Sequence, residues 1–118
     1  MKNNRLKSYR HGLWAEYLVA GYLMLKGYRI VCMRYKSPVG EVDLIARKKE
    51  YLVVVEVKFR KGAKSAGEIL ETIHTKNQVR VERAMAYFLA GNPQFSDCSV
   101  RFDGVAVSWP LSIRHLDN

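Results

Sequence analysis

Two acidic residues and a lysine stand in neighbouring segments at a spacing suited to metal chemistry. Asp43 lies in residues 40–46, and Glu56 and Lys58 lie in the apolar run of residues 52–60. Alternate side chains of a strand share a face, so Glu56 and Lys58 point the same way. Two carboxylates that meet repel each other, and a hard divalent cation with oxygen ligands relieves that repulsion. The pattern predicts a site for Mg²⁺, or for Mn²⁺ as second choice, suited to phosphodiester hydrolysis.

Strand register decides whether the two carboxylates meet. If Arg47 faces Leu52 across a four-residue loop, Asp43 lies opposite Glu56 with Cβ atoms about 5 Å apart. A slip of one residue would separate them. In the favoured register, Lys58 would orient the attacking water or neutralise charge building on the phosphate.

A plainer interpretation of these charges stays open. Glu56 and Lys58 would then mark the exposed face of an antiparallel strand, with Glu56 paired to Lys58 or Arg60. The hydrophobic run of residues 52–57 favours a central strand instead.

Glu16 is a further acid in an unusual setting. On a helical wheel its neighbours are all apolar, namely Leu13, Val19, Ala20 and Leu23. A carboxylate on a buried face needs a partner. Glu16 would be a third metal ligand or general base, or it would bond a nearby Arg or Tyr, and the sequence favours neither. Glu41 shares a face with Asp43 by strand alternation and would bind metal through water or pair with an Arg.

The charge of the chain favours an extended polyanion as partner. Twenty basic residues stand against 11 acidic ones, a formal net charge of +9 in 118 residues, which attracts nucleic acid. The excess lies in residues 1–12 and 47–64. We expect DNA, contacted by Arg5, Lys7, Arg10, Arg60, Lys61, Lys64 and Lys76. Lys76 is included because the start of a helix presents backbone N–H groups to phosphate.

The order of predicted elements indicates one α/β domain over residues 1–118. We expect a helix from a cap at Ser8 to about Lys26, strands at 28–33, 41–46, 52–60 and 100–108, and a short element at 111–116. Residues 75–78 have the form of a capping box that opens a second helix ending near Gly91. The loop 61–67 and the undecided segment 68–74 precede it. Helices would pack on a central mixed sheet.

Several smaller features complete the expectations. Trp14, at helical spacing, is predicted to be core, and Asp103 to form a structural hydrogen bond beside Arg101. Cys32 and Cys98 fit neither a zinc site nor a disulfide framework, which favours a cytoplasmic setting. Residues 13–25 superficially resemble a signal peptide, but Glu16 interrupts them and no cleavage site follows. We therefore expect neither export nor a membrane span.

The combination of motifs resembles a known group of proteins. A helix acid, then Gly-Glu-Val-Asp-Leu-Ile-Ala at 40–46, then Val-Glu-Val-Lys-Phe-Arg at 55–60, is similar to the PD-(D/E)XK nuclease superfamily. More closely, the chain resembles the YraN family of small endonuclease-like bacterial proteins, and in layout the archaeal Holliday-junction resolvases. Further matching positions are His11-Gly12, Ala15-Glu16, Gly27-Tyr28, Lys76 and Arg101-Phe102-Asp103.

The resemblance implies a restriction endonuclease-like fold and assigns roles by position. Asp43, Glu56 and Lys58 take the superfamily's metal-binding and catalytic places, and Glu16 that of a first-helix acid. The chain departs from the superfamily's pattern in one respect, since Val42 replaces the proline before Asp43.

The expected function is therefore Mg²⁺-dependent hydrolysis of DNA, branched or single-stranded. A resolvase-like role would favour a homodimer, because two cuts need two sites. Two alternatives remain at this stage: a non-catalytic DNA-binding or adaptor module that keeps the fold, and a protein-interaction scaffold.

Overall fold

The structure is a computed structural model that describes residues 2–61, 66–109 and 112–116, with the side chains of 13–59, 78–107 and 113–116. Its elements in chain order are α1 (Lys2–Leu25), β1 (Arg29–Ser37), β2 (Gly40–Lys48), β3 (Tyr51–Lys61), α2 (Ala66–Gly91), the 3-10 helix η1 (Pro93–Phe95), β4 (Ser99–Trp109) and β5 (Ser112–Leu116).

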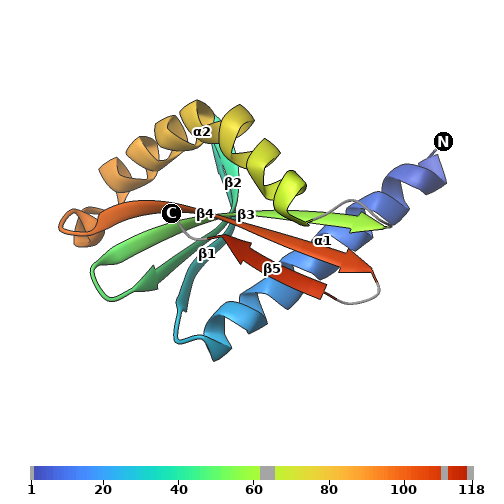
Figure 1. The fold of residues 1–118 in the computed structure, drawn as a ribbon. Helices are drawn as coiled ribbons and strands as arrows, with labels where there is room; N and C mark the ends of the chain where they lie inside the picture. The colour runs from blue at the N-terminus through green and yellow to red at the C-terminus, as the bar shows by residue number, and fades with distance from the viewer. Residues whose placement is uncertain (1, 62–65, 110–111, 117–118) are drawn as a thin grey trace.

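The five strands form one mixed sheet between two helices. Their spatial order is β1-β2-β3-β4-β5, with β3 and β4 parallel and the other neighbours antiparallel. A parallel pair needs a crossover connection, which α2 provides. The helix α2 covers one face of the sheet and α1 the other (Figure 1). This α/β architecture confirms the predicted fold class and is compatible with a restriction endonuclease-like fold.

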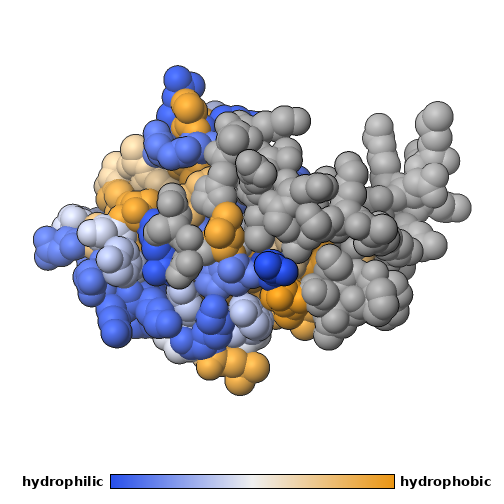
Figure 2. Space-filling view, in the orientation of Figure 1, coloured by the Kyte–Doolittle hydropathy of each residue, from blue (hydrophilic) through white to orange (hydrophobic). Residues whose placement is uncertain are grey.

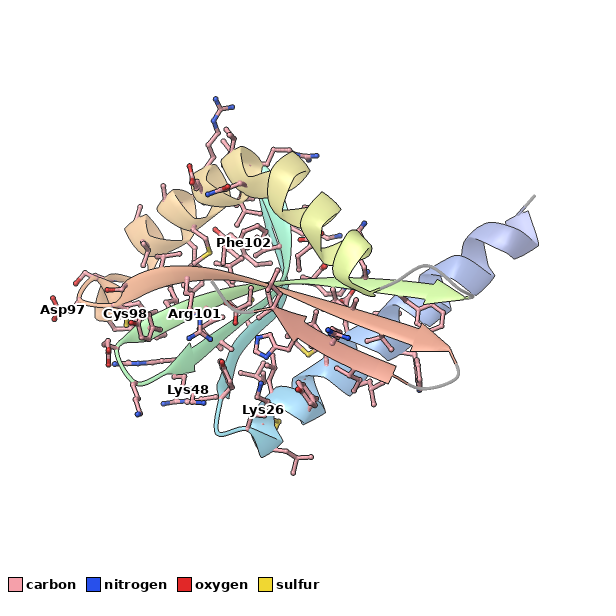
Figure 3. The ribbon with its side chains drawn as sticks, in the orientation of Figure 1. Lys26, Lys48, Asp97, Cys98, Arg101 and Phe102 are labelled. Carbon is pink, nitrogen blue, oxygen red and sulfur yellow. The ribbon has the colours of Figure 1, made fainter. Side chains whose placement is uncertain are left out.

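Each helix packs on its own side of the sheet. Buried residues of α2 meet Ile45, Leu52 and Val54, while those of α1 meet Leu44, Val53 and other inner-strand residues. The apolar run in β3 is buried on both faces, as expected of a central strand. The expected alternation holds there, and Figure 3 shows it in β4, where Arg101 points to the α1 side and Phe102 to the α2 side.

Both helices begin earlier than the sequence signals predicted. The helix α1 starts at Lys2, not after Ser8, and α2 starts at Ala66, so residues 75–78 lie inside it. The capping-box prediction was wrong, and segment 68–74 is helical. Residues 66–74 contain good helix formers, whose propensity carries the helix through the polar stretch. Gln78 donates instead to Glu82, one turn away, at 3.4 Å.

The hairpin between β2 and β3 is tighter than predicted but keeps the predicted register. Both strands extend until only Lys49 and Glu50 connect them, and Lys49 has a φ of 55°. Arg47 nevertheless pairs with Leu52. Trp14 was predicted to be core, yet 45% of it is exposed, and its ring forms a T-shaped pair with that of Phe59. None of the described helices is long and apolar enough to cross a membrane.

Candidate metal centre

The candidate site forms where β2 and β3 separate. Their ladder ends at Leu44 and Val55, while β3 stays paired with β4 as far as Lys61. The next residue of each strand is a carboxylate, Asp43 in β2 and Glu56 in β3. Asp43 Oδ2 accepts a hydrogen bond of 2.8 Å from the backbone N–H of Val57. A side chain thus replaces the backbone acceptor that β2 would have supplied, which fixes Asp43 in the gap.

The regular alternation of side chains along β2 is interrupted at Asp43. Leu44 and Ala46 pack on the α1 side, but Val42 packs on the α2 side, where regular alternation would not place it. Gly40 follows on the same side, since a Cβ there would lie 3.1 Å from the carbonyl oxygen of Arg80 in α2. Regular alternation therefore does not hold between Glu41 and Asp43, and the prediction that they share a face cannot rest on it. Both residues nevertheless line one pocket.

The neighbouring strand is irregular at the same level. Met33 packs on the α1 side and Tyr35 on the α2 side, with Arg34 between them at a φ of 55°. A residue other than glycine in this conformation costs about 1–3 kcal/mol and persists only where its surroundings hold it. The register places Arg34 across from Asp43. Two adjacent strands therefore reverse their facing together, at the residues of the candidate site.

Glu16 reaches the site from α1. It is 7% exposed, and its Oε1 lies 3.2 Å from Arg34 Nε. This is one of the two outcomes that the sequence left open, a bond to a nearby Arg. The same Oε1 is fully buried and accepts no hydrogen bond of good geometry from any residue whose side chain is described. The carboxylate is thus countered by charge but incompletely bonded.

Burial and mutual repulsion make these carboxylates difficult to ionise. Burial, then repulsion from Asp43, raises the pKa of Glu16 against the attraction of Arg34. Burial raises the pKa of Asp43, although the Val57 hydrogen bond and the cations Lys58 and Arg34 oppose the rise. For Glu56, burial first and Asp43 second raise the pKa to about 7, with Lys58 opposing. Because neighbouring carboxylates share protons, we place the retained proton on Glu56.

Two basic side chains complete the electrostatics. Lys58, on the same face as Glu56, lowers the pKa of both Glu56 and Asp43. Arg80 of α2 also lowers the pKa of Glu56. Beside the carboxylates opens a pocket of about 100 Å³, lined by Arg34, Tyr35, Lys36, Glu41, Val42 and Asp43. The sequence predicted Asp43, Glu56, Lys58 and Glu16 as site residues but did not identify Arg34. The one indication of Arg34 in the sequence was that a buried Glu16 needs a cation as partner.

The donor set fits a magnesium ion. No group of three or more His, Cys, Asp and Glu side chains lies close enough to hold a metal within the described part of the chain. Mg²⁺ is commonly bound through only one or two carboxylates and keeps several waters. Asp43 and Glu56 supply that number of oxygen-donor groups, and the incompletely bonded oxygen of Glu16 lies nearby. A bound cation would stabilise the ionised form of carboxylates that resist ionisation in the free protein.

The structure does not describe the side chains that were predicted to contact DNA. Those of Arg5, Lys7, Arg10, Arg60, Lys61 and Lys76 fall outside the described side chains, and Lys64 outside the described residues. Lys76 lies within α2 and not at its start. The reason for including it, a free helix N-terminus, is therefore removed.

A second polar cluster lies at the far end of α1. Asp103, fully buried, accepts two hydrogen bonds of 2.9 Å from Arg101 and one of 2.7 Å from His115 Nε2. Lys26 Nζ lies 2.8 Å from His115 Nδ1. An ammonium only donates, so Nδ1 accepts, and the protonated Nε2 donates its hydrogen bond to Asp103. Arg101 also donates to the Tyr28 hydroxyl. The predicted structural bond of Asp103 with Arg101 is confirmed.

Comparison with known proteins gives the chain a family. Residues 15–107 match the model of the uncharacterised protein family UPF0102. This chain belongs to UPF0102. Its relatives include the UPF0102 proteins of Parvibaculum lavamentivorans, 46% identical over 94% of this chain and 81% of the relative, and of Chelativorans sp., 39% identical over 96% and 91%. That of Mesorhizobium japonicum is 42% identical over 98% and 90%.

The family match confirms the resemblance to the YraN family, which is this UPF0102 family. Within UPF0102 the matched range contains Glu16, Asp43, Glu56 and Lys58, and it also contains Asp103. It ends before His115. The family is uncharacterised, so function has to be argued from the site.

Proposed function

We propose that this UPF0102 protein is a metal-dependent nuclease that binds DNA, branched or single-stranded, and hydrolyses its phosphodiester bonds. One observation carries the proposal. Asp43 and Glu56 are the first residues beyond the end of the β2–β3 ladder, both with raised pKa values, and Lys58 stands beside them. Oxygen ligands for a divalent cation beside an ammonium are the groups that phosphoryl chemistry needs.

Each residue of the candidate site has its own role in this proposal. Asp43 and Glu56 would hold Mg²⁺ or Mn²⁺, which when bound polarises a phosphoryl oxygen and lowers the pKa of an attacking water. Lys58 orients that water and offsets the negative charge that builds on the phosphate. Glu16 serves as third ligand or general base beside Asp43. Glu41, which is exposed and lines the same pocket, is the weaker candidate ligand, acting through water.

Binding of the substrate rests on charge. The net charge of +9 attracts a polyanion, and the described basic residues near the candidate site include Lys58, Arg34 and Arg80. A homodimer belongs to the proposal, since two cuts across a branched DNA need two sites, and light scattering would measure it. We also place the protein in the cytoplasm, which suits the free thiols of Cys32 and Cys98.

The ion pair between Glu16 and Arg34 favours a second candidate, a non-catalytic DNA-binding or adaptor module. In that case Arg34 neutralises Glu16 permanently and the acids hold the strands together. Both candidates predict DNA binding that weakens with salt. They differ in whether the site turns over.

The deciding experiment is cleavage of linear, flapped and four-way DNAs with Mg²⁺ or Mn²⁺. Wild type is compared with Lys58→Ala, and Arg114→Ala, an exposed change of the same charge on β5, is the control. We expect cleavage by wild type and Arg114→Ala, and a loss of about 100-fold or more in Lys58→Ala with most binding kept. Equal activity in Lys58→Ala would overturn the catalytic assignment. No cleavage of any substrate would favour the adaptor.

A further inference from the structure

Two arginines face each other at the hairpin end of the sheet. Arg29 of β1 pairs directly with Arg47 of β2, one residue before a β-bulge between Ile30 and Cys32. Side chains paired in this way share a face with Cβ atoms about 5 Å apart, and like charges there are destabilising. Both are exposed, and neither forms an ion pair with any residue whose side chain the structure describes. An anion between them would remove the repulsion.

The same two arginines line a pocket. Its volume is about 270 Å³, and its walls are Arg29, Ile30, Val31, Arg47, Gln94 and Phe95. Pockets that bury a drug-sized ligand hold about 300–1,000 Å³. This one is slightly smaller, which suits a single nucleotide unit. Hydrophilic residues dominate the surface at this end of the sheet, around the connection of β2 and β3 (Figure 2).

An aromatic ring in the pocket is held in place from behind. Phe95 of η1 is half-buried and stacks on Phe88 of α2, with ring centroids 5.9 Å apart and planes 28° apart. The guanidinium carbon of Arg47 lies 5.8 Å from the Phe95 centroid. Arg47 Nε also donates to the carbonyl oxygen of Lys49 at 3.3 Å. Ring and guanidinium therefore keep one arrangement, in which the Arg47 charge stays at the pocket wall.

The chemistry of the walls selects a ligand. Two guanidinium groups suit a phosphate, which arginine binds through paired hydrogen bonds. An aromatic ring and an arginine plane are the surfaces on which unpaired bases stack, and the exposed amide of Gln94 can bond a base edge. A base inside a duplex is not available for this stacking. The combination thus fits a phosphate joined to an unpaired base.

We propose that this pocket binds one unpaired nucleotide of a single-stranded nucleic acid, with its phosphate between Arg29 and Arg47 and its base against Phe95. The inference rests on the proposed DNA binding but requires no cleavage. Arg47 lies four residues from Asp43 along β2, about 13 Å at ~3.3 Å per residue. The pocket is therefore separate from the candidate metal centre.

The first test measures binding of a fluorescein-labelled single-stranded DNA to the whole protein by anisotropy, in EDTA so that nothing is cleaved. Arg29→Ala/Arg47→Ala is compared with Arg83→Ala/Arg114→Ala, which removes the same charge from exposed positions on α2 and β5. We expect a loss of about tenfold or more in the pocket variant and less than about threefold in the control. The salt slope should fall by about 0.7–1.4 in the pocket variant. Equal affinities of the two double variants would overturn the proposal.

The second test isolates stacking from charge. Phe95→Leu keeps an apolar side chain against Phe88, so the fold is preserved, and a thermal melt confirms it. Loss of one stacked base should weaken single-strand binding by about fivefold or more, with the salt slope unchanged and duplex binding unaffected. An equal loss on duplex and single strand would overturn the assignment of the base.

Failure of the pocket and failure of the proposed function are distinguishable. A wild-type protein that binds single strands through Arg29, Arg47 and Phe95 but cleaves nothing would keep the pocket and remove the nuclease. Cleavage by wild type, together with equal affinities of the two double variants for single strands, would support the nuclease and overturn the pocket. No binding of single strands by wild type at low salt would overturn the pocket, whatever the cleavage result.

Discussion

Asp43 and Asp103 are both aspartates on strands of one sheet, yet their surroundings shift their pKa values in opposite directions. Burial would raise the pKa of Asp103, but hydrogen bonds from His115 and Arg101 outweigh it and hold the pKa below its usual value. Burial raises the pKa of Asp43 too, and there the single hydrogen bond from Val57 and nearby cations do not compensate. Desolvation is common to both, so the difference is in the partners.

The comparison separates a structural network from a candidate site. Asp103 has a bidentate arginine and a histidine, and Tyr28 and Lys26 extend the network, so its charge is used within the fold. Around Asp43 the neighbours include further acids as well as Arg34 and Lys58, and two strands are irregular. Satisfied networks stabilise, whereas perturbed acids held in a strained setting are candidates for function. Each prediction below would break or sharpen this contrast.

The largest expected effect is on stability, at Asp103. In Asp103→Ala the Arg101 guanidinium, whose side chain is only 15% exposed, loses its counter-charge. Breaking a buried pair in this way costs about 3–5 kcal/mol of unfolding free energy. Urea denaturation measures it, with Asp97→Ala, an exposed aspartate labelled in Figure 3, as a control that should stay within about 0.5 kcal/mol. A loss below about 1 kcal/mol would contradict the structural role.

The next effect should be on cleavage and not on stability. Asp43→Asn keeps an oxygen that can accept from Val57 but removes a charge from the candidate site. Cleavage with Mg²⁺ should fall by about 10²–10³-fold, the size of other losses of transition-state stabilisation, while the melting temperature stays level or rises. Asp97→Asn again serves as the control. A drop in melting temperature as large as that of Asp103→Ala would show that Asp43 is a structural aspartate, and the contrast would fail.

The pH dependence of stability should carry opposite signs in the two regions. The unfolded chain releases the Glu56 proton near pH 4.5, whereas the folded protein keeps it to about pH 7. Between these values the folded state binds more protons, so stability in EDTA falls as pH rises. For Asp103, whose folded pKa is lowered, the stabilisation is present above its ordinary pKa of 3.8 and is lost as pH falls through the folded value.

Glu56→Gln isolates the first of these effects. Urea denaturation of wild type and Glu56→Gln across pH 4.5 to 8 should show a wild-type decline, up to about pH 7, that the variant lacks. The difference between the two curves is the observable, because groups outside the cluster of Glu16, Asp43 and Glu56 titrate alike in both proteins. Parallel curves would mean that Glu56 ionises as it does in the unfolded chain.

Local pattern was sufficient for the strands at the centre of the sheet. The apolar run in β3 demanded burial on both faces, and the predicted register, with Arg47 opposite Leu52, followed from the hairpin. That register brought Asp43 and Glu56 to the end of the ladder. Helix ends were less predictable, because the capping signal at residues 75–78 lies inside α2 and has no effect there.

Features that depend on packing could not be deduced. Residues 13–25 are apolar almost all round, so a helical wheel does not say which stripe is covered, and Trp14 proved to be 45% exposed. The reversal of facing at Arg34 and Asp43 requires two strands and both helices at once. The opposition of Arg29 and Arg47 depends on a bulge at Val31, which shifts the register by one residue.

The smallest expected effect is at Arg29 and Arg47. Here two like charges face each other, in contrast to the paired charges around Asp103. Arg29→Gln keeps a polar side chain, shorter than that of arginine, and removes one of two charges that face each other. Because like charges directly opposite across an antiparallel pair are destabilising, the unfolding free energy should rise, by about 0.2–1 kcal/mol in low salt. Salt screens the repulsion, so the gain should shrink as ionic strength increases.

Urea denaturation at two salt concentrations measures both the gain in stability and its dependence on salt, with Arg83→Gln as the control. A loss of stability in Arg29→Gln would show that Arg29 is held by favourable contacts within the fold, and the need for an anion between the two arginines would disappear.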